Sequence, residues 1–422
     1  MAQNLTGAEA ILKDFYVAPI QEQLNDEVLA LQLFEQSSVD WSGRKAIVPV
    51  HISHNSGVGF RAEGDDLPTA GAQGYERLEI GAKSLLGRFG FTGEALEFTD
   101  SNKGAFESVM SGEMKRLAKS VRVIANKSMF TGGSIIGLIW QQKNEVGAAS
   151  WQYSGRPSNA VDTNWGVEVG GANTVDVIRL DTYATHAAGV AISACTETSI
   201  TLGALDTTAT PDGTVFAIKH NNANRVKESS GILDNLFNPT HYSVARQDGS
   251  GNEILQSNSL VADFAAAAPV YNDLTLDALQ IVMDRVLLAS DGEVDLMLMS
   301  PVHRQSYTTL LQGTAAGIPG AVRMDVKDGK TKGDAGFKSI GYAGVEFRTS
   351  QHAPKGTFSM LSREGWAVYQ AKPGDFAQAD GKVLNKVTNK NAYEGFWVHY
   401  MNLVCTRPNS QGVLTGVSSI GV

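Results

Sequence analysis

The sequence predicts an α+β fold with an extended β-hairpin arm, a long helix and a small inserted β-domain. Three observations lead to this prediction: a Gly-rich polar stretch between two extended runs, a long helical periodicity, and a segment where charge becomes sparse and short strands follow one another. The 42% apolar and 19% charged residues are typical of a globular chain. Because 422 residues exceed what one compact core usually holds, we expect two or three sub-domains.

The first predicted element is a helix over residues 8–36. Apolar residues recur there at intervals of three and four, the spacing of one helix face. Pro19 interrupts the pattern, so we expect a break at that position. Met1 to Gly7 shows no basic segment followed by an apolar run, and apolar runs elsewhere are short. We therefore expect neither a signal peptide nor a membrane span.

The arm is predicted from residues 44–98. Lys45–Ser53 alternates apolar and polar residues as a strand does, and Pro49 restricts that strand to an edge or a bulge. A stretch dense in Gly and turn formers follows at 57–74, and a second extended run continues from Tyr75 through Gly93. Two strands joined by a polar tip indicate a protruding hairpin. Such an arm buries little against its own domain, which favours a subunit that lies across a neighbour.

The long helix is predicted over residues 102–130. Six apolar residues fall on one stripe: Phe106, Met110, Met114, Leu117, Val121 and Ile124. Ser101 or Asn102 precedes the run and Gly132-Gly133 follows it, as expected at helix ends. A second set, which is basic, lies on the remaining surface: Lys115, Arg116, Lys119 and Arg122. We interpret this basic face as solvated, with phosphate contact open if the helix lines a container.

Residues 138–225 predict a small β-barrel or sandwich inserted in the main fold. Charge is sparse there, and short strands are expected at 174–178, 189–193, 198–202 and 214–218. The order helix, buried strand, helix is predicted across 273–312, with the strand at Val294–Ser300 and Pro301 opening the second helix. A Gly-rich and Lys-rich loop without periodicity is expected at 313–341.

Strands return in the last quarter of the chain. They are predicted at Val345–Thr349, Thr357–Leu361, Trp366–Gln370 and Tyr393–Cys405. The last of these carries large apolar groups on both alternating faces, so we expect it to be buried on both sides. On that expectation, Trp397→Ala should cost roughly 3–5 kcal/mol.

The composition argues against several functions. A net charge of −9 and a pI of about 5.4 oppose a dedicated nucleic-acid reader, which would present a basic face. Cys195 and Cys405 cannot form a disulfide framework, which favours a reducing compartment. The phosphate-loop pattern ending in Gly329-Lys330-Thr331 fails because Met324 occupies the first Gly position. A nucleophile elbow at Gly132–Ile136 fails because Ile136 stands where the last Gly belongs.

No metal or catalytic constellation is predicted either. His51 and His54 form the closest histidine pair, but a spacing of three along a strand puts them on opposite faces, without further ligands nearby. Asp65-Asp66 at the arm tip lacks the alternating oxygen ligands of a calcium loop. A solvated turn, or a salt bridge to another subunit, is the preferred interpretation. We expect no catalytic residues, no cofactor and no metal.

The order of these segments resembles the major capsid proteins of tailed bacteriophages, which have the Hong Kong 97 fold. The resemblance runs from about residue 40 to the C-terminus, without a strict signature. It rests on Glu63–Tyr75 with Leu86–Gly93, which is similar to the family's extended loop and return strand, and on the 102–130 helix at the place of its spine helix. Three later stretches are also similar to the family: Asp295–Arg304, Val345–Arg363 and Tyr400–Asn409.

The resemblance implies a structural protein rather than an enzyme. It implies self-assembly into hexamers and pentamers of an icosahedral virion shell enclosing double-stranded DNA, which is held without sequence reading. Further implied partners are a portal and separate scaffold or decoration proteins, with no membrane and with assembly in the host cytoplasm. The family's Lys–Asn cross-link with its promoting Glu cannot be placed in this sequence, and Lys83 near the arm is interpreted as solvated.

The family's plan suggests boundaries along the chain. They are an N-terminal arm and helix at 1–43, the extended loop at 44–98, the spine helix at 99–137, the inserted β-domain at 138–225, a peripheral connection at 226–272, the axial domain at 273–380 and the terminal peripheral strand at 381–422.

At the arm we expect intersubunit contacts from six residues: Arg61, Glu63, Asp65, Asp66, Tyr75 and Arg77. Three alternatives stay open. They are an encapsulin-like nanocompartment shell, another phage structural protein such as a tail tube, and an enzyme with an unrecognised site.

Overall fold

A computed structural model describes most of the second half of the chain and much of the first. The described residues are 28–35, 38–95, 109–132, 135–140, 150–153, 161–162, 167–168, 174–179, 184–195, 199–203, 215–220, 228–238, 240–246, 260–263, 274–290, 292–312, 341–354, 356–378, 383–415 and 417. The chain divides into two units. One comprises Met1–Asp26, Gly87–Ser120 and Phe376–Trp397, and the other comprises Glu27–Leu86, Val121–Asp375 and Val398–Val422.

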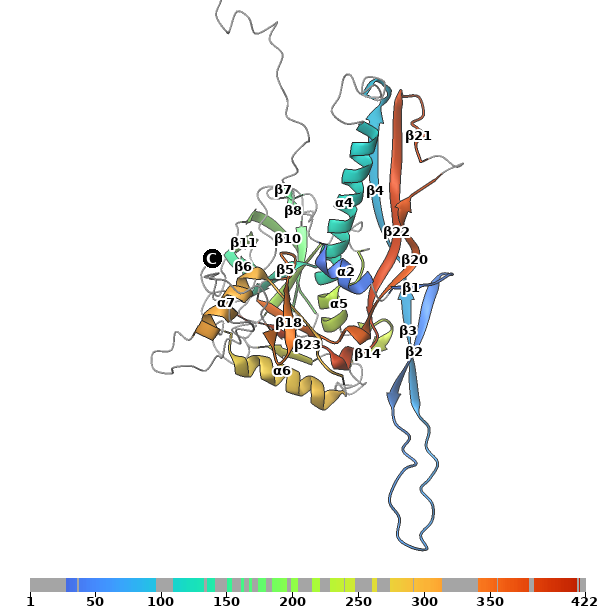
Figure 1. Cartoon of the computed structure of the whole chain (residues 1–422), viewed down its shortest axis with the longest axis vertical. Helices are drawn as coiled ribbons and strands as arrows, with labels where there is room; N and C mark the ends of the chain where they lie inside the picture. Colours follow the sequence, from blue (N-terminus) through green and yellow to red (C-terminus); the bar gives the residue numbers. More distant parts are fainter. Residues whose placement is uncertain are drawn as a thin grey trace, which may run out of the picture. The chain divides into compact units, whose positions relative to one another are not determined.

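A six-stranded sheet forms one centre of the larger unit. Its strands, in spatial order, are β15 (Leu260–Asp263), β23 (Gly412–Thr415), β19 (Thr357–Leu361), β16 (Leu296–Met299), β18 (Val345–Thr349) and β17 (Gly341–Tyr342). Helices α6 (Leu276–Ala289) and α7 (Pro301–Gln312), gold and orange in Figure 1, precede and follow β16. The predicted order helix, buried strand, helix is confirmed, as are the strands at 345–349 and 357–361.

Strand β16 separates two hydrophobic cores because its side chains alternate between its faces. Met297 and Met299 pack with α6 residues, while Leu296 and Leu298 pack into a second cluster. That second cluster combines residues of α2 (Leu29–Glu35), the end of α4 (Val109–Phe130), α5 (Ile232–Phe237) and several strands. All four β16 side chains are buried, which explains its continuous run of apolar residues.

A closed six-stranded barrel lies within residues 135–220. Its strands, in spatial order, are β10 (Thr185–Cys195), β11 (Ser199–Leu202), β6 (Ser150–Tyr153), β5 (Ile135–Trp140), β12 (Val215–His220) and β9 (Thr174–Arg179). Val175, Val177 and Phe216 are fully buried. Four of the strands coincide with predicted ones, whereas β5 and β6 were not predicted and β5 starts before residue 138. The domain boundaries at 138 and 225 stay predictions.

Strand β22 (Ala392–Cys405) belongs to a five-stranded sheet in which β1 (Ser38–Asp40), β20 (Trp366–Phe376), β22 and β21 (Asn385–Lys386) follow one another. Strand β4 (Lys83–Thr92) also pairs with β22. Burial on both faces was predicted for the whole of β22. It holds from Met401 to Cys405 but is wrong near Phe396, which is 39% exposed. Trp397 is only partly buried, so its truncation should cost less than predicted.

The smaller unit contains an aromatic cluster that accounts for Trp397. Phe376 lies edge-on to Trp397 with ring centroids 5.0 Å apart, and it also lies edge-on to Phe89 at 5.9 Å. Phe91 stacks near Phe89 at 6.2 Å and contacts Tyr393 at the same centroid distance. Such edge-to-face and offset pairs stabilise by about 0.5–1.5 kcal/mol each beyond the burial of their surface.

Helix α4 is the predicted long helix, and it ends at Phe130 as expected. Val121 is buried and Leu117 partly buried, in agreement with the predicted apolar stripe. The basic side chains of Lys115, Arg116, Lys119 and Arg122 are exposed. The start of this helix, the break at Pro19 and most of the 313–341 loop lie outside the described residues.

A buried histidine, His241, should make the larger unit sensitive to acid. Its Nε2 lies 2.6 Å from the carbonyl oxygen of Cys405, which can only accept, so Nε2 carries the proton. Burial, and then the charge of Arg246, lower the pKa of His241 to about 3 from 6.5. Between these values the unfolded chain binds a proton that the folded chain does not, so acidification favours unfolding.

We therefore expect the unfolding free energy to fall as pH drops below 6.5. The contribution of this one proton approaches about 1.4 kcal/mol per pH unit. His241→Gln keeps an N–H donor but cannot ionise, so it should be less stable at neutral pH yet lose stability less steeply in acid. Chemical denaturation of both proteins at several pH values measures this difference. Parallel pH profiles would contradict the assignment to His241.

Candidate assembly surfaces

The predicted arm is present as an antiparallel hairpin. Strands β2 (Lys45–Ser53) and β3 (Gly74–Gly81) pair from Lys45 with Gly81 to Ser53 with Gly74. Beyond the strands the chain continues as a long two-legged loop that extends away from the sheets of the same unit (Figure 1). Within the described residues β2 pairs with β3 alone, so Pro49 lies in an edge strand as predicted.

The arm exposes apolar side chains that its own subunit leaves uncovered. Val58 is 84% exposed, Phe60 107% and Leu67 89%. Each would gain roughly 1.5–3 kcal/mol if it were fully buried. Exposed apolar side chains gathered on one protruding loop are typical of a surface that contacts another protein.

The two legs of the loop approach closely at a pair of glycines. A side-chain carbon on Gly57 would lie 2.7 Å from the Gly71 nitrogen, and one on Gly71 would lie 2.7 Å from the Gly57 nitrogen. Within one leg, the Asn55 side-chain oxygen accepts a hydrogen bond from the Gly57 N–H at 2.7 Å. Both positions therefore require glycine, and the pinch at 57 and 71 separates the tip from the strands.

A tight turn shapes the tip. The Asp65 N–H donates to the Ala62 carbonyl oxygen at 3.2 Å, and the Asp65 carboxylate accepts from the Ala62 N–H at 3.2 Å. Gly64 has a φ of +88°, which suits the third position of a type II turn. Asp65 is thus a structural residue of the turn, while Glu63 and Asp66 project beside it with exposed side chains.

The six predicted contact residues fall into two groups. Arg61, Glu63, Asp65 and Asp66 are brought together by the tip turn, and all of them are exposed. Tyr75 and Arg77 lie instead on one face of β3, two residues apart, and are also exposed. The structure therefore gathers four of the six in one place. That any of them contacts a second subunit stays a prediction.

A short hairpin contacts the base of the arm through a backbone hydrogen bond. Between β13 (Thr240–His241) and β14 (Val244–Ala245), Tyr242 and Ser243 both have positive φ, at 45° and 82°. The Tyr242 carbonyl accepts from the Glu79 N–H of β3 at 3.0 Å, and the Tyr242 hydroxyl donates to the Leu403 carbonyl at 2.7 Å. Positive φ in non-glycine residues is strained. These contacts hold the turn in place and link the arm to β22.

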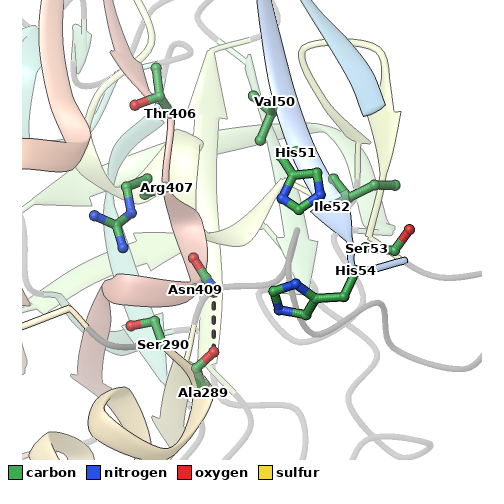
Figure 2. Close-up of a pocket in the computed structure, with 10 residues that line it drawn as sticks. All are labelled: Val50, His51, Ile52, Ser53, His54, Ala289, Ser290, Thr406, Arg407 and Asn409. Carbon is green, nitrogen blue, oxygen red and sulfur yellow. Dashed lines mark hydrogen bonds between the residues drawn. The ribbon is translucent and has the colours of Figure 1, made fainter. Parts of the chain in front are cut away.

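A pocket lies where β2 ends, and two of its walls are shown in Figure 2. Its volume is about 500 Å³, and His51 and His54 line it together, with ring centroids 5.7 Å apart. The prediction that these histidines occupy opposite faces is wrong. The β2–β3 register shifts between His51 and Ser53, and the strand ends at Ser53. The alternation of side chains between the two faces of a strand therefore does not extend to His54.

The opposite wall of this pocket comes from two distant parts of the chain. Ala289 and Ser290 end α6, and Thr406, Arg407 and Asn409 lie around the short 3-10 turn η2 (Pro408–Ser410). The Asn409 side-chain amide donates to the Ala289 carbonyl at 3.3 Å, which fixes this wall (dashed in Figure 2). The ten lining residues include no Asp or Glu.

Among the described residues, no three His, Cys, Asp or Glu side chains gather as possible ligands of a metal ion. Cys405 is a buried free thiol, and burial raises its pKa to about 12, so it is protonated at neutral pH and unreactive. No helix in the described part of the chain has the length and apolarity needed to cross a membrane.

The loop at residues 55–75 should be the most protease-sensitive segment of the unassembled subunit. Its backbone outside the tip turn makes few hydrogen bonds, and its side chains are exposed. Limited proteolysis with mass spectrometry, on unassembled and assembled protein, measures this sensitivity. Assembly should protect the loop if a neighbouring subunit covers it. Equal cleavage in the two states would show that the arm stays in solvent.

Comparisons with known proteins agree with the architecture. No protein-family model matches the chain, and no curated protein matches its sequence. Among solved structures, a chain of the cyanophage A-1(L) capsid asymmetric unit matches with a TM-score of 0.57 and 10% identity, over 97% of this chain and 98% of that one. The chain has a Hong Kong 97-like capsid fold.

Two further structures with this Hong Kong 97-like fold come from GTA particles. A chain of the native GTA particle capsid, computed with C5 symmetry, has a TM-score of 0.54 and 8% identity, with 99% of this chain and 100% of that chain covered. The empty GTA particle capsid gives 0.54 and 9%, with 98% of each chain covered. Each match spans both chains almost completely, so this chain is similar in length to the chains of these structures.

Proposed function

We propose that this protein is the major capsid protein of a tailed bacteriophage. Subunits assemble into hexamers and pentamers and close an icosahedral shell around double-stranded DNA. The observation that carries this proposal is the end-to-end likeness to chains of phage and GTA capsids. The exposed arm supports it, since its apolar tip is uncovered in the isolated subunit.

Self-assembly follows from the kind of surface that the arm offers. The tip and the surface that receives it are different parts of the subunit, so their contact is head-to-tail and can close into rings. Each contact is small, but a closed shell makes every subunit hold several neighbours at once, which multiplies the stability of weak contacts. A portal and separate scaffold or decoration proteins would complete assembly in the host cytoplasm.

DNA would be held without sequence reading. The net charge of −9 opposes tight binding to phosphates. The exposed basic residues of α4, Lys115 and Arg122 among them, are the described groups best suited to touch packaged DNA weakly. No step of this function needs catalysis, so we propose that the protein is not an enzyme.

Particle size and contents test the proposal directly. Purified protein expressed alone, or with the neighbouring genes of its source, should form megadalton particles visible by negative stain. Particles from the native source should protect double-stranded DNA from nuclease. Particles filled with protein cargo instead would indicate an encapsulin-type compartment. Tubes would indicate a tail protein, and a small oligomer at all concentrations would contradict a shell function.

A further inference from the structure

The pocket at the arm base has the chemistry of a carboxylate-binding site. It presents the imidazoles of His51 and His54, the guanidinium of Arg407 and the hydroxyls of Ser290 and Thr406, and its lining contains no acidic residue. All of these groups can donate hydrogen bonds to a carboxylate. Planar guanidinium groups bind carboxylates especially well.

Arg407 already contacts one acidic side chain outside the pocket, Glu364, at 3.2 Å. Glu364 is 80% exposed, so this pair is screened by solvent and holds Arg407 only weakly. Arg407 lines the pocket, and its guanidinium is always charged, so it contributes a positive charge there.

The walls also offer apolar surface, from Val50, Ile52 and Ala289. A fitting occupant would combine carboxylates with an apolar side chain. The arm tip, residues 58–70, has this composition, with three carboxylates against the single guanidinium of Arg61. Phe60 and Leu67 flank the acidic turn and are almost fully exposed.

The tip cannot reach the pocket of its own subunit. It stands at the far end of the two legs, which run on from β2 and β3 away from the sheets (Figure 1), whereas the pocket is lined by the end of β2. The two legs approach each other closely at Gly57 and Gly71. An occupant from this segment must therefore come from another molecule.

We propose that the arm tip (residues 58–70) of one subunit docks in the arm-base pocket of a second copy of this chain, with Glu63 and Asp66 facing His51, His54 and Arg407. The proposal rests on the shell function proposed above and names the acceptor of its arm contact. One arm then fills the next subunit's pocket, and the contact propagates around a ring or between rings.

Substitutions that change the charge on each side test this contact. The pocket variant His51→Glu with His54→Glu, and the tip variant Glu63→Lys with Asp66→Lys, should each reduce the particle fraction by roughly tenfold or more, because like charges then oppose each other. Combining all four changes should restore particles, since the introduced Glu and Lys side chains then face each other with opposite charges. Asp65 is left unchanged because it forms the tip turn.

These substitutions sit on exposed side chains, so folding should be unaffected, and the denaturation midpoint of each soluble subunit checks this. As a control, the tip variant is combined with Arg348→Glu and Arg363→Glu, two exposed cations outside the pocket, which should not restore particles. Sedimentation velocity gives the particle fraction in every case.

A second measurement captures the contact directly. His54→Cys with Glu63→Cys should form disulfides between copies in mildly oxidised particles, giving a ladder on a non-reducing gel. Arg348→Cys with Glu63→Cys should not. Disulfides form only when the Cα atoms approach to roughly 4.4–6.8 Å, so the ladder reports docking.

The results separate the two proposals. Wild-type protein that forms no particles would overturn the shell function itself. Wild-type shells together with pocket and tip variants that assemble normally would overturn the docking proposal and leave the shell function standing. A pocket variant that fails to assemble and is not rescued by the reversed tip, with no ladder, would show that something else occupies the pocket, such as a free anion, and would also overturn the docking.

Discussion

Trp366→Ala should lower the unfolding free energy by about 3–5 kcal/mol, the range for removing a large aromatic side chain from a core. Trp366 is 1% exposed and packs on Phe34 with ring centroids 5.6 Å apart. Its indole N–H also donates to the Gln411 side-chain oxygen at 2.9 Å. That same oxygen accepts from the Ser362 N–H at 2.9 Å, so truncation leaves a cavity beside a buried amide.

Two further variants help to show how much of the stability lost in Trp366→Ala comes from buried volume and how much from the hydrogen bond. Trp366→Phe keeps a six-membered aromatic ring but loses the N–H and part of the buried volume, so it should cost less than Trp366→Ala and at least the roughly 1 kcal/mol of the lost hydrogen bond. Trp397→Ala is the matched control, because Trp397 is only partly buried and should lose less than Trp366→Ala. Urea denaturation of the three variants beside the wild type gives the comparison. Equal losses at Trp366 and Trp397 would show that both residues contribute alike to the core.

Much of this fold could be predicted because its strongest patterns are local. Strand β2 begins and ends at the predicted residues, since alternation and the Gly-rich tip both mark it. The β16 strand and its flanking helices follow from a short apolar run, a proline and helical spacing. Strand β5 was missed because Ile135–Trp140 is a short continuous apolar run without alternation, which period alone does not identify as a strand.

The pocket could not be predicted because it depends on contacts between distant segments. His51 and His54 share a wall only because the strand is irregular after His51, which no residue pattern indicates. Arg407 and Asn409 reach the same pocket through the packing of η2 on the end of α6. The strained Tyr242-Ser243 turn was also missed, because such positive-φ hairpin positions normally hold Asn or Gly.

The arm tip itself offers a test in which folding and assembly separate. Replacing residues 58–70 by a short Gly-Ser linker between Gly57 and Gly71 should leave the unfolding free energy within about 0.5 kcal/mol of wild type. The reason is that Val58, Phe60 and Leu67 are 84%, 107% and 89% exposed, so the subunit gains almost nothing from them when it folds. Chemical denaturation of the unassembled subunit checks this.

If the protein forms the proposed shells, the same variant should lose them almost completely. If the tip buries its apolar side chains on a neighbour, each contact removes from water groups that stabilise by roughly 1.5–3 kcal/mol apiece. Their loss recurs at every subunit of a closed shell, so a modest change per contact becomes a large change in assembly.

A milder triple change of Val58, Phe60 and Leu67 to Ser should raise the protein concentration needed for assembly without abolishing it. Sedimentation velocity over a concentration series measures both effects, and wild-type particles from the linker variant would show that the arm contributes nothing to the shell.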